Sequence, residues 1–242
     1  MSEYVSCKIE NSIAYIAMDD GKNNLLTPLM IDQLNNALDT AEKQNAIVVL
    51  TGRPGVFSAG FDLKTMQKGG GEALKMLNGG FALSGRLLAF PTPVIIACSG
   101  HAVAMGCFLT LSGDYRIGVV GDYKIVANEV EIGLPMPESM IETCRQRLKP
   151  GYLDRAVMMS ECFGPSTAVD AGFFDRVVSA ESLHLEAKKL AERYLTLDMH
   201  AHKLSKLRLR RDMLKKHKRA LLKDRIGVVK MGLARMLKGR AR

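Results

Sequence analysis

A helix pattern with strand patterns on both sides constrains the fold more than any other feature of this 242-residue chain. Residues 27–42 carry apolar side chains at helical spacing, with Thr27 placed to cap the helix and Pro28 in its first turn. Residues 4–18 alternate apolar and polar side chains, which is typical of a β-hairpin, and residues 46–51 form a short apolar, β-branched run. This order predicts an α/β fold with a covered sheet.

The rest of the chain extends this pattern. Further strands are predicted at residues 94–98 and 115–119, and the chain from Glu138 onward is predicted to be mainly helical. Residues 64–80, which contain five glycines, are predicted to form a mobile surface loop beside a short helix. Without a linker rich in Pro and Ser, we expect a core at residues 1–180 and a helical oligomerisation region at 181–242.

Composition narrows the class of protein. A hydrophobic content of 47% is enough for a substantial core, and no apolar run approaches the roughly 20 residues that span a bilayer. The N-terminus has no targeting pattern, so we expect a soluble, cytoplasmic protein with no membrane partner. The cysteines form no CxxC pair and no cluster with histidine, so neither a disulfide framework nor a metal site is expected; they are Cys7, Cys98, Cys107, Cys144 and Cys162.

The basic residues gather at the C-terminus. The net charge is +9, and residues 201–242 hold 16 Lys or Arg against two Asp. Such a segment can bind nucleic acid, an anionic membrane surface or a phosphate-bearing ligand. It contains no Phe, Trp or Tyr to stack on bases, which argues against nucleic acid.

Three segments carry candidate chemistry. In VFSAGFDLK, residues 56–64, the small Ala59 and Gly60 precede Phe61 and would let a ligand approach the backbone; alternatively, this is an ordinary turn with Asp62 capping a helix. In residues 99–117, Gly100 and Gly106 precede an apolar helix whose first N–H groups would face an anion, or which is simply a buried helix entry.

The third segment is ANEVEIGLPMPE, residues 127–138. It places Glu129 and Glu131 among apolar and turn-forming residues, where burial would raise the pKa of a carboxyl group. The alternative is that both are surface glutamates at a strand end. Glu138 follows Pro137 and is expected to begin a helix rather than to act in catalysis.

Together, and in this order, the three segments resemble the crotonase superfamily, also called the enoyl-CoA hydratase/isomerase family. The resemblance runs from the first hairpin through MSECFGPSTAVDAGFFDRVV at residues 159–178. It implies an α/β, crotonase-like spiral of β-β-α units with a helical C-terminal region, assembled as a homotrimer or a dimer of trimers. The implied oxyanion hole consists of the backbone N–H groups of Phe61 and Met105.

The resemblance also implies the substrate and the reaction class. The ligand would be an acyl-CoA thioester, with coenzyme A as part of the substrate and no permanently bound cofactor. Family hydratases have a first glutamate where this chain has Phe108, whereas Glu129 corresponds to their second and lies in a stretch similar to that of the Δ3-Δ2-enoyl-CoA isomerases. Glu129 is therefore the predicted base, ahead of Glu131 and Glu138. The predicted substrate-binding residues are Lys22, Asn24, Leu25, Ala59, Gly60, Asp62, Leu63, Gly106 and Phe108.

Three functions follow in order of preference. The first is Δ3-Δ2-enoyl-CoA isomerisation in fatty acid metabolism and β-oxidation, because one carboxylate suffices to move a proton. The second is an enoyl-CoA hydratase or related lyase, and the third a non-catalytic CoA- or RNA-binding homologue. The C-terminal helices are predicted to pack on a neighbouring subunit, with Lys206 and Arg210 facing coenzyme A phosphates.

Overall fold

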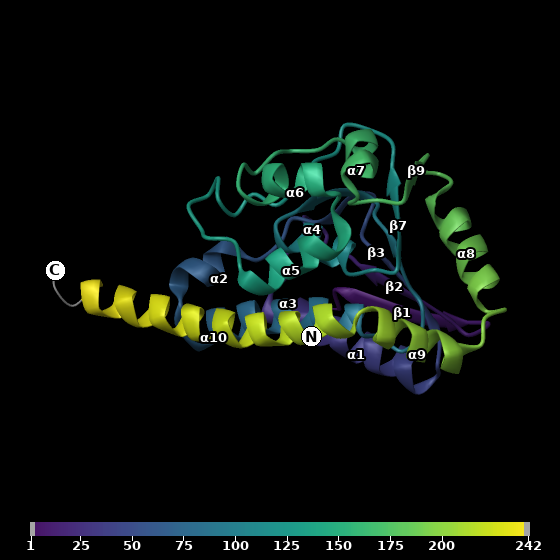
Figure 1. Ribbon diagram of the computed structural model, residues 1–242, viewed down its shortest axis with the longest axis horizontal. Coiled ribbons are helices and arrows are strands. Elements are labelled where there is room, and N and C mark those ends of the chain that lie inside the picture. The colour runs from purple at the N-terminus through teal and green to yellow at the C-terminus, as the bar shows by residue number, and fades with distance from the viewer. Residues whose placement is uncertain (1–2, 240–242) are drawn as a thin grey trace.

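The computed structural model describes residues 3–239 and has two sheets surrounded by helices (Figure 1). The larger sheet has the strand order β1-β2-β3-β5-β7-β9 and the smaller one the order β4-β6-β8. The hairpin of β1 and β2 is antiparallel, and all the other neighbouring strands are parallel. The strands are β1 (Val5–Glu10), β2 (Ile13–Met18), β3 (Ile47–Thr51), β4 (Gly55–Ser58), β5 (Val94–Ala97), β6 (Gly100–Val103), β7 (Tyr115–Val119), β8 (Ile125–Val126) and β9 (Arg176–Val178).

The helices follow the strands in a repeating order. Strands β3 and β4 lead into α2 and α3, strands β5 and β6 into α4, and strands β7 and β8 into α5. In each unit the first strand joins the larger sheet and the second joins the smaller one, which gives the predicted spiral of β-β-α units. The helices are α1 (Pro28–Lys43), α2 (Leu63–Lys68), α3 (Gly70–Leu88), α4 (Met105–Leu111), α5 (Glu138–Arg147), α6 (Pro150–Val157), α7 (Pro165–Ala171), α8 (Leu183–Tyr194), α9 (Met199–Leu209) and α10 (Arg211–Gly239).

Strand β3 shows why the sheet is covered on both faces. Val48 and Leu50 belong to the main core between the sheets and helices, whereas Ile47 and Val49 belong to a second cluster under α8. A strand buried on both faces reads as a continuous apolar run, which is why residues 46–51 lack alternation. The predicted helix before it is α1, and the Thr27 hydroxyl accepts a hydrogen bond from the Met30 N–H at 3.2 Å.

The predicted mobile loop at residues 64–80 is wrong. The segment forms α2 and the first half of α3; Gly69, with a φ of 71°, lies between them, and Gly70, with a φ of 73°, begins α3. Gly79 and Gly80 lie inside α3, where a Cβ at Gly80 would come within 2.4 Å of the Phe61 ring. These glycines are there for close packing, which a reading of glycines as loop signals misses.

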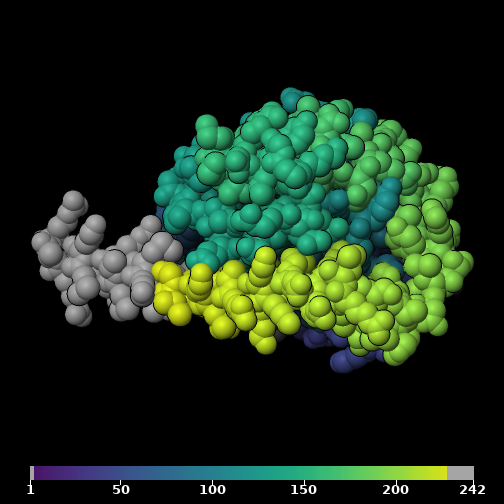
Figure 2. All heavy atoms as spheres, in the orientation of Figure 1, coloured from purple at the N-terminus to yellow at the C-terminus, as the bar shows by residue number. Residues whose placement is uncertain are grey.

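The C-terminal helices pack on their own chain. Helix α10 packs against α3 and α5 and runs along the lower side of the molecule in the views of Figures 1 and 2. Lys206 and Arg210 are buried and form ion pairs with Asp114 at 2.6 and 2.8 Å. The prediction that these two side chains face coenzyme A phosphates is therefore wrong. The oligomerisation role of residues 181–242 stays a prediction, and residues 240–242 of that region lie outside the described part. Across residues 3–239, no helix is both long and apolar enough to cross a bilayer.

Candidate functional site

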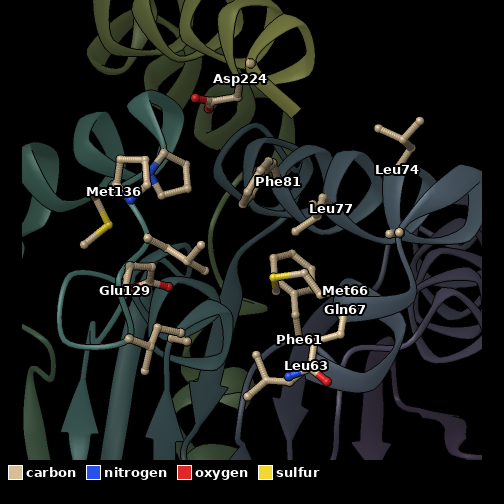
Figure 3. Close-up of a pocket in the computed structure, with 18 of the residues that line it drawn as sticks. Phe61, Leu63, Met66, Gln67, Leu74, Leu77, Phe81, Glu129, Met136 and Asp224 are labelled. Atoms are coloured by element: carbon tan, nitrogen blue, oxygen red, sulfur yellow. The ribbon is translucent and has the colours of Figure 1, made fainter. Parts of the chain in front are cut away.

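A largely apolar cavity of about 860 Å³ lies between α2, α3, the segment after β8, and α10 (Figure 3). Its volume falls in the range of pockets that enclose a small organic ligand. Apolar side chains make up most of its wall, among them Phe61, Leu63, Met66, Leu77, Phe81, Ile132, Leu134 and Met136. The carboxylates on the described part of the wall are those of Glu129, Glu138 and Asp224.

Phe61 enters the cavity at the end of the glycine loop after β4. The Leu26 N–H donates to the Gly60 carbonyl at 2.8 Å in a parallel bridge between Leu26 and Phe61. In such a bridge the flanking residues make the hydrogen bonds, so the N–H of Phe61 points away from Leu26. The Phe61 ring packs edge-to-face on Phe81, with ring centroids 5.6 Å apart. The contact with Phe81 therefore fixes the Phe61 ring, while the Phe61 N–H takes no part in the hydrogen bonds of the bridge with Leu26.

The start of α4 lies directly against this loop. A Cβ at Gly60 would lie 3.2 Å from the Met105 nitrogen and 2.9 Å from the Ala104 Cβ, and Gly60 has a φ of +85°. Met105 is the first residue of α4, so its N–H has no acceptor within the helix. Ala104 adopts φ 50° and ψ −124°, an unusual conformation for a residue with a side chain. The structure thus brings together the two backbone segments predicted to form an oxyanion hole.

Glu129 lies on the cavity wall just after β8. The Ala104 N–H donates to the Val126 carbonyl at 2.8 Å, which ties the start of α4 to the strand that carries Glu129. Glu129 is only 8% exposed, and its Oε2 atom is buried without a hydrogen-bond partner. Burial raises the pKa of Glu129 to about 7, while a hydrogen bond from its own N–H lowers it by less. A carboxyl group with this pKa can exchange a proton near neutral pH.

The other glutamates of this segment have different surroundings. Glu131 is exposed, and its N–H donates to the Ser160 hydroxyl at 3.1 Å because the chain turns after Glu129. Glu138 begins α5 as predicted and forms an exposed ion pair with Lys223 at 2.8 Å. Among the three glutamates, Glu129 alone combines burial with a place on the cavity wall.

The predicted substrate-binding residues divide into two groups. Ala59 and Leu63 line the cavity, and Gly60 forms the contact with α4. Asp62 instead caps α2, where its carboxylate accepts from the Lys64 and Thr65 N–H groups at 3.1 and 3.2 Å. The Thr65 hydroxyl is the main reason that the pKa of Asp62 lies below its ordinary value. Asp62 therefore has the capping role that was the alternative interpretation.

Five other predicted residues are not among the described residues that line the cavity, namely Lys22, Asn24, Leu25, Gly106 and Phe108. The buried Asn24 amide donates to the Met18 and Phe57 carbonyls, at 2.9 and 3.1 Å, and so holds the chain in place. A Cβ at Gly106 would lie 2.3 Å from the Ser58 oxygen, so that glycine serves packing. The Phe108 ring is 1% exposed and lies in the core. The side chains of Asn24 and Phe108 are thus buried in the fold, and a role for these residues in substrate binding stays a prediction.

The sequence interpretation missed two parts of the wall. One is the inner face of α3, with Leu77 and Phe81, because its glycines were taken for loop signals. The apolar spacing of Ala73, Leu77 and Phe81 was a usable helix signal. The other is α10, which contributes Asp224 and Gly227 from far along the chain. No local pattern indicates that contact.

Similarity to known proteins identifies the family of this chain. Residues 8–231 match the family model described as enoyl-CoA hydratase/isomerase, and the chain belongs to that family. The resemblance inferred from the three segments is therefore confirmed.

Individual relatives carry different activity names. The chain is 28% identical over 207 residues to rat mitochondrial enoyl-CoA delta isomerase 1, covering 84% of this chain and 72% of the relative. A structure of an enoyl-CoA hydratase/isomerase family protein from Pseudomonas syringae is 43% identical, with a TM-score of 0.90, covering 92% and 96% of the two chains. An enoyl-CoA hydratase from Mycobacterium marinum is 40% identical, with a TM-score of 0.87, covering 92% and 98%. The spiral fold is thereby confirmed, and the choice between activities depends on the site.

Metal ligation has no support within the described residues. No group of three or more His, Cys, Asp or Glu side chains there is placed to hold a metal ion. The buried cysteines are poor nucleophiles, because burial raises the pKa of Cys98 to about 12 and that of Cys107 well above its ordinary value.

Proposed function

We propose that this protein is an enoyl-CoA isomerase that moves the double bond of an acyl-CoA thioester from C3–C4 to C2–C3. The observation that carries the proposal is Glu129, a buried carboxylate on the cavity wall with a pKa of about 7 and no partner for Oε2. A general base is most effective when its pKa lies near the working pH. The unsatisfied oxygen leaves Glu129 available to a proton of the substrate.

The backbone supplies the second requirement of this chemistry. Removing the weakly acidic proton at C2 places negative charge on the thioester oxygen, and two N–H donors would stabilise it. The N–H groups of Phe61 and Met105 are the candidates, supported by the close approach of Gly60 to Met105 and by the free start of α4. Loss of one such donor typically costs about 10²- to 10³-fold in rate.

The proton balance needs a single carboxylate. Glu129 removes a proton from C2 of a 3-enoyl thioester, and the C–H electrons move into a dienolate. The same carboxyl group returns the proton to C4, which leaves the double bond between C2 and C3. No electron is gained or lost overall, so the step itself needs no redox cofactor, and coenzyme A enters and leaves as part of the substrate.

Hydration is the second candidate, because related proteins bear the name hydratase. Adding water requires groups that both position and deprotonate a water molecule, and a cooperating acid or base typically contributes about 10²- to 10⁴-fold. The position of the first family glutamate holds the buried ring of Phe108. The other cavity carboxylates, Glu138 and Asp224, are engaged in contacts between α5 and α10. These features favour isomerisation.

An activity comparison tests the proposal directly. The purified protein is incubated with 3-enoyl-CoA and 2-enoyl-CoA thioesters, and isomerised and hydrated products are separated and quantified. We expect double-bond migration to exceed hydration. Faster hydration would replace the proposal with a hydratase, and tight acyl-CoA binding without either product would favour a non-catalytic homologue.

A substitution at Gly60 tests the proposed oxyanion hole. In Gly60→Ala the new Cβ would come within 2.9 Å of the Ala104 Cβ and the Val103 oxygen, so the Phe61 and Met105 amides must move apart. Misplacing reacting groups by about 1 Å costs on the order of 10²-fold, and we expect kcat to fall by about that factor.

Gly55→Ala is the matched control for this variant. Gly55 has the same φ of +85°, but a Cβ there meets nothing within 4 Å. Gly55→Ala therefore reproduces the backbone strain of Gly60→Ala without a steric clash of the new Cβ, and it should retain most of the activity. Equal losses of kcat in the two variants would mean that strain alone is responsible and that the contact between Gly60 and Met105 is not needed.

A further inference from the structure

Helix α10 lines the end of the cavity opposite Leu63. Figure 3 shows Asp224, on that helix, across the cavity from Leu63 and Gln67, with Phe81 and Leu77 between them. Lys223, Asp224 and Gly227 all belong to the wall. An acyl chain that starts beside Phe61 and Glu129 and follows the apolar wall would meet α10 at its far end.

Polar contacts fix the position of α10 at this end. Helix α5 begins after Pro137, which provides no side-chain cap. The Asp224 carboxylate supplies one from α10, accepting from the N–H groups of Glu138 and Ser139 at 2.8 and 2.9 Å. Unpaired N–H groups at a helix start favour such an acceptor, so this contact makes α10 a fixed wall.

Gly227 is one helical turn after Asp224 and leaves space in that wall. A Cβ at Gly227 would meet nothing within 4 Å, although the residue is inside a long helix and lines the cavity. Glycine in a helix interior is destabilising relative to alanine, so its presence there calls for a reason. Close neighbours account for Gly80 and Gly85 of α3, where a Cβ would lie 2.4 and 2.9 Å from Phe61 and His217. Gly227 has no such neighbour within the described residues.

We propose that Gly227 determines the acyl-chain length that the protein accepts, by leaving room at the far end of the cavity for a medium or long chain. The inference rests on the proposed function in that the ligand is an acyl-CoA thioester. The volume of about 860 Å³ would remain mostly empty around a short acyl group. Each additional buried methylene contributes about fourfold in affinity, from about 0.8 kcal/mol per CH₂.

Gly227→Leu tests the inference by filling the space. The affinities of hexanoyl-, dodecanoyl- and hexadecanoyl-CoA are measured by calorimetry, which does not depend on turnover. We expect the variant to bind hexadecanoyl-CoA at least about tenfold more weakly, since two excluded methylenes suffice for that factor, with a far smaller change for hexanoyl-CoA. The rate with 3-hexadecenoyl-CoA relative to 3-hexenoyl-CoA should fall in parallel.

Ile226→Leu is the matched control, because Ile226 is the preceding residue of α10 and its side chain is 56% exposed. It should leave the chain-length dependence unchanged. Unchanged hexadecanoyl-CoA affinity in Gly227→Leu, or equal losses for all three chain lengths, would overturn the role of Gly227. Failure of the wild-type protein to turn over any enoyl-CoA would refute the proposed isomerase. The calorimetric affinities would still test whether Gly227 sets the acyl-chain length.

Discussion

Glu129→Gln is expected to lower kcat for isomerisation by about 10²- to 10⁴-fold while acyl-CoA affinity changes little, because the amide keeps the shape of the side chain but cannot accept the proton. Steady-state kinetics with 3-enoyl-CoA and calorimetry with a saturated acyl-CoA measure the two quantities. Glu131→Gln is the matched control, since Glu131 is in the same turn but is exposed. Full activity in Glu129→Gln would remove Glu129 as the base.

The pH dependence of kcat/KM tests the role of Glu129 independently. Burial raises the pKa of Glu129 to about 7, and only the ionised form can remove the C2 proton. The wild-type kcat/KM should therefore rise with pH through about 7 and level off above it. Glu131→Gln should show the same profile, whereas the residual rate of Glu129→Gln should lack this transition.

As pH rises, the stability of the folded protein should fall while its activity increases. A raised carboxyl pKa means that the unfolded chain loses its proton near pH 4.5 while the folded protein keeps it to about pH 7. The free energy of unfolding therefore falls as pH rises through this window, by roughly 3 kcal/mol for a shift of this size. Glu129→Gln removes the cost of ionising the buried group. Urea unfolding should show the variant to be more stable at pH 8 and nearly equal to the wild type at pH 4.

Local signals account for the parts of the fold that the sequence predicted correctly. The Thr27 cap and apolar spacing of α1 lie within the element itself, as do the β-branched runs of β3, β5 and β7. The glycines of α3 gave the wrong result because the reason for Gly80 is the ring of Phe61, which is distant in sequence. A local pattern cannot distinguish a glycine that ends a helix from one that admits a neighbour.

The candidate site divides in the same way. The segments that carry Gly60, Met105 and Glu129 were selected from the sequence, and their juxtaposition follows from strand pairing of β4, β6 and β8. The wall supplied by α10 was not predictable, because it depends on the capping of α5 by Asp224 across the fold. The basic residues Lys206 and Arg210 were likewise assigned to an anionic ligand because their partner, Asp114, is far away in the sequence.

Asp114 holds the C-terminal helices against the core, and Asp114→Asn is expected to lower the free energy of unfolding by about 3 to 5 kcal/mol. Its carboxylate binds Lys206 at 2.6 Å and Arg210 at 2.8 Å, with side-chain exposures of 14%, 4% and 6% for the three residues. It also accepts from the Val94 N–H at 2.8 Å. Without the carboxylate, two buried cations lose their counter-ion. Urea unfolding monitored by circular dichroism measures the loss.

Asp212→Asn is the control, because Asp212 forms an exposed pair with Arg211 at 3.6 Å, and such surface pairs contribute about 0 to 1 kcal/mol. The cause of the loss in Asp114→Asn can be tested by adding Lys206→Met to that variant. The second substitution replaces one of the two unpaired buried cations with an apolar side chain of similar length. If uncompensated buried charge destabilises Asp114→Asn, the double variant should recover part of the stability. If the loss instead reflects the hydrogen bond to Val94, adding Lys206→Met should bring no recovery. If Asp114→Asn loses no more stability than Asp212→Asn, the buried ion cluster does not hold the C-terminal helices in place.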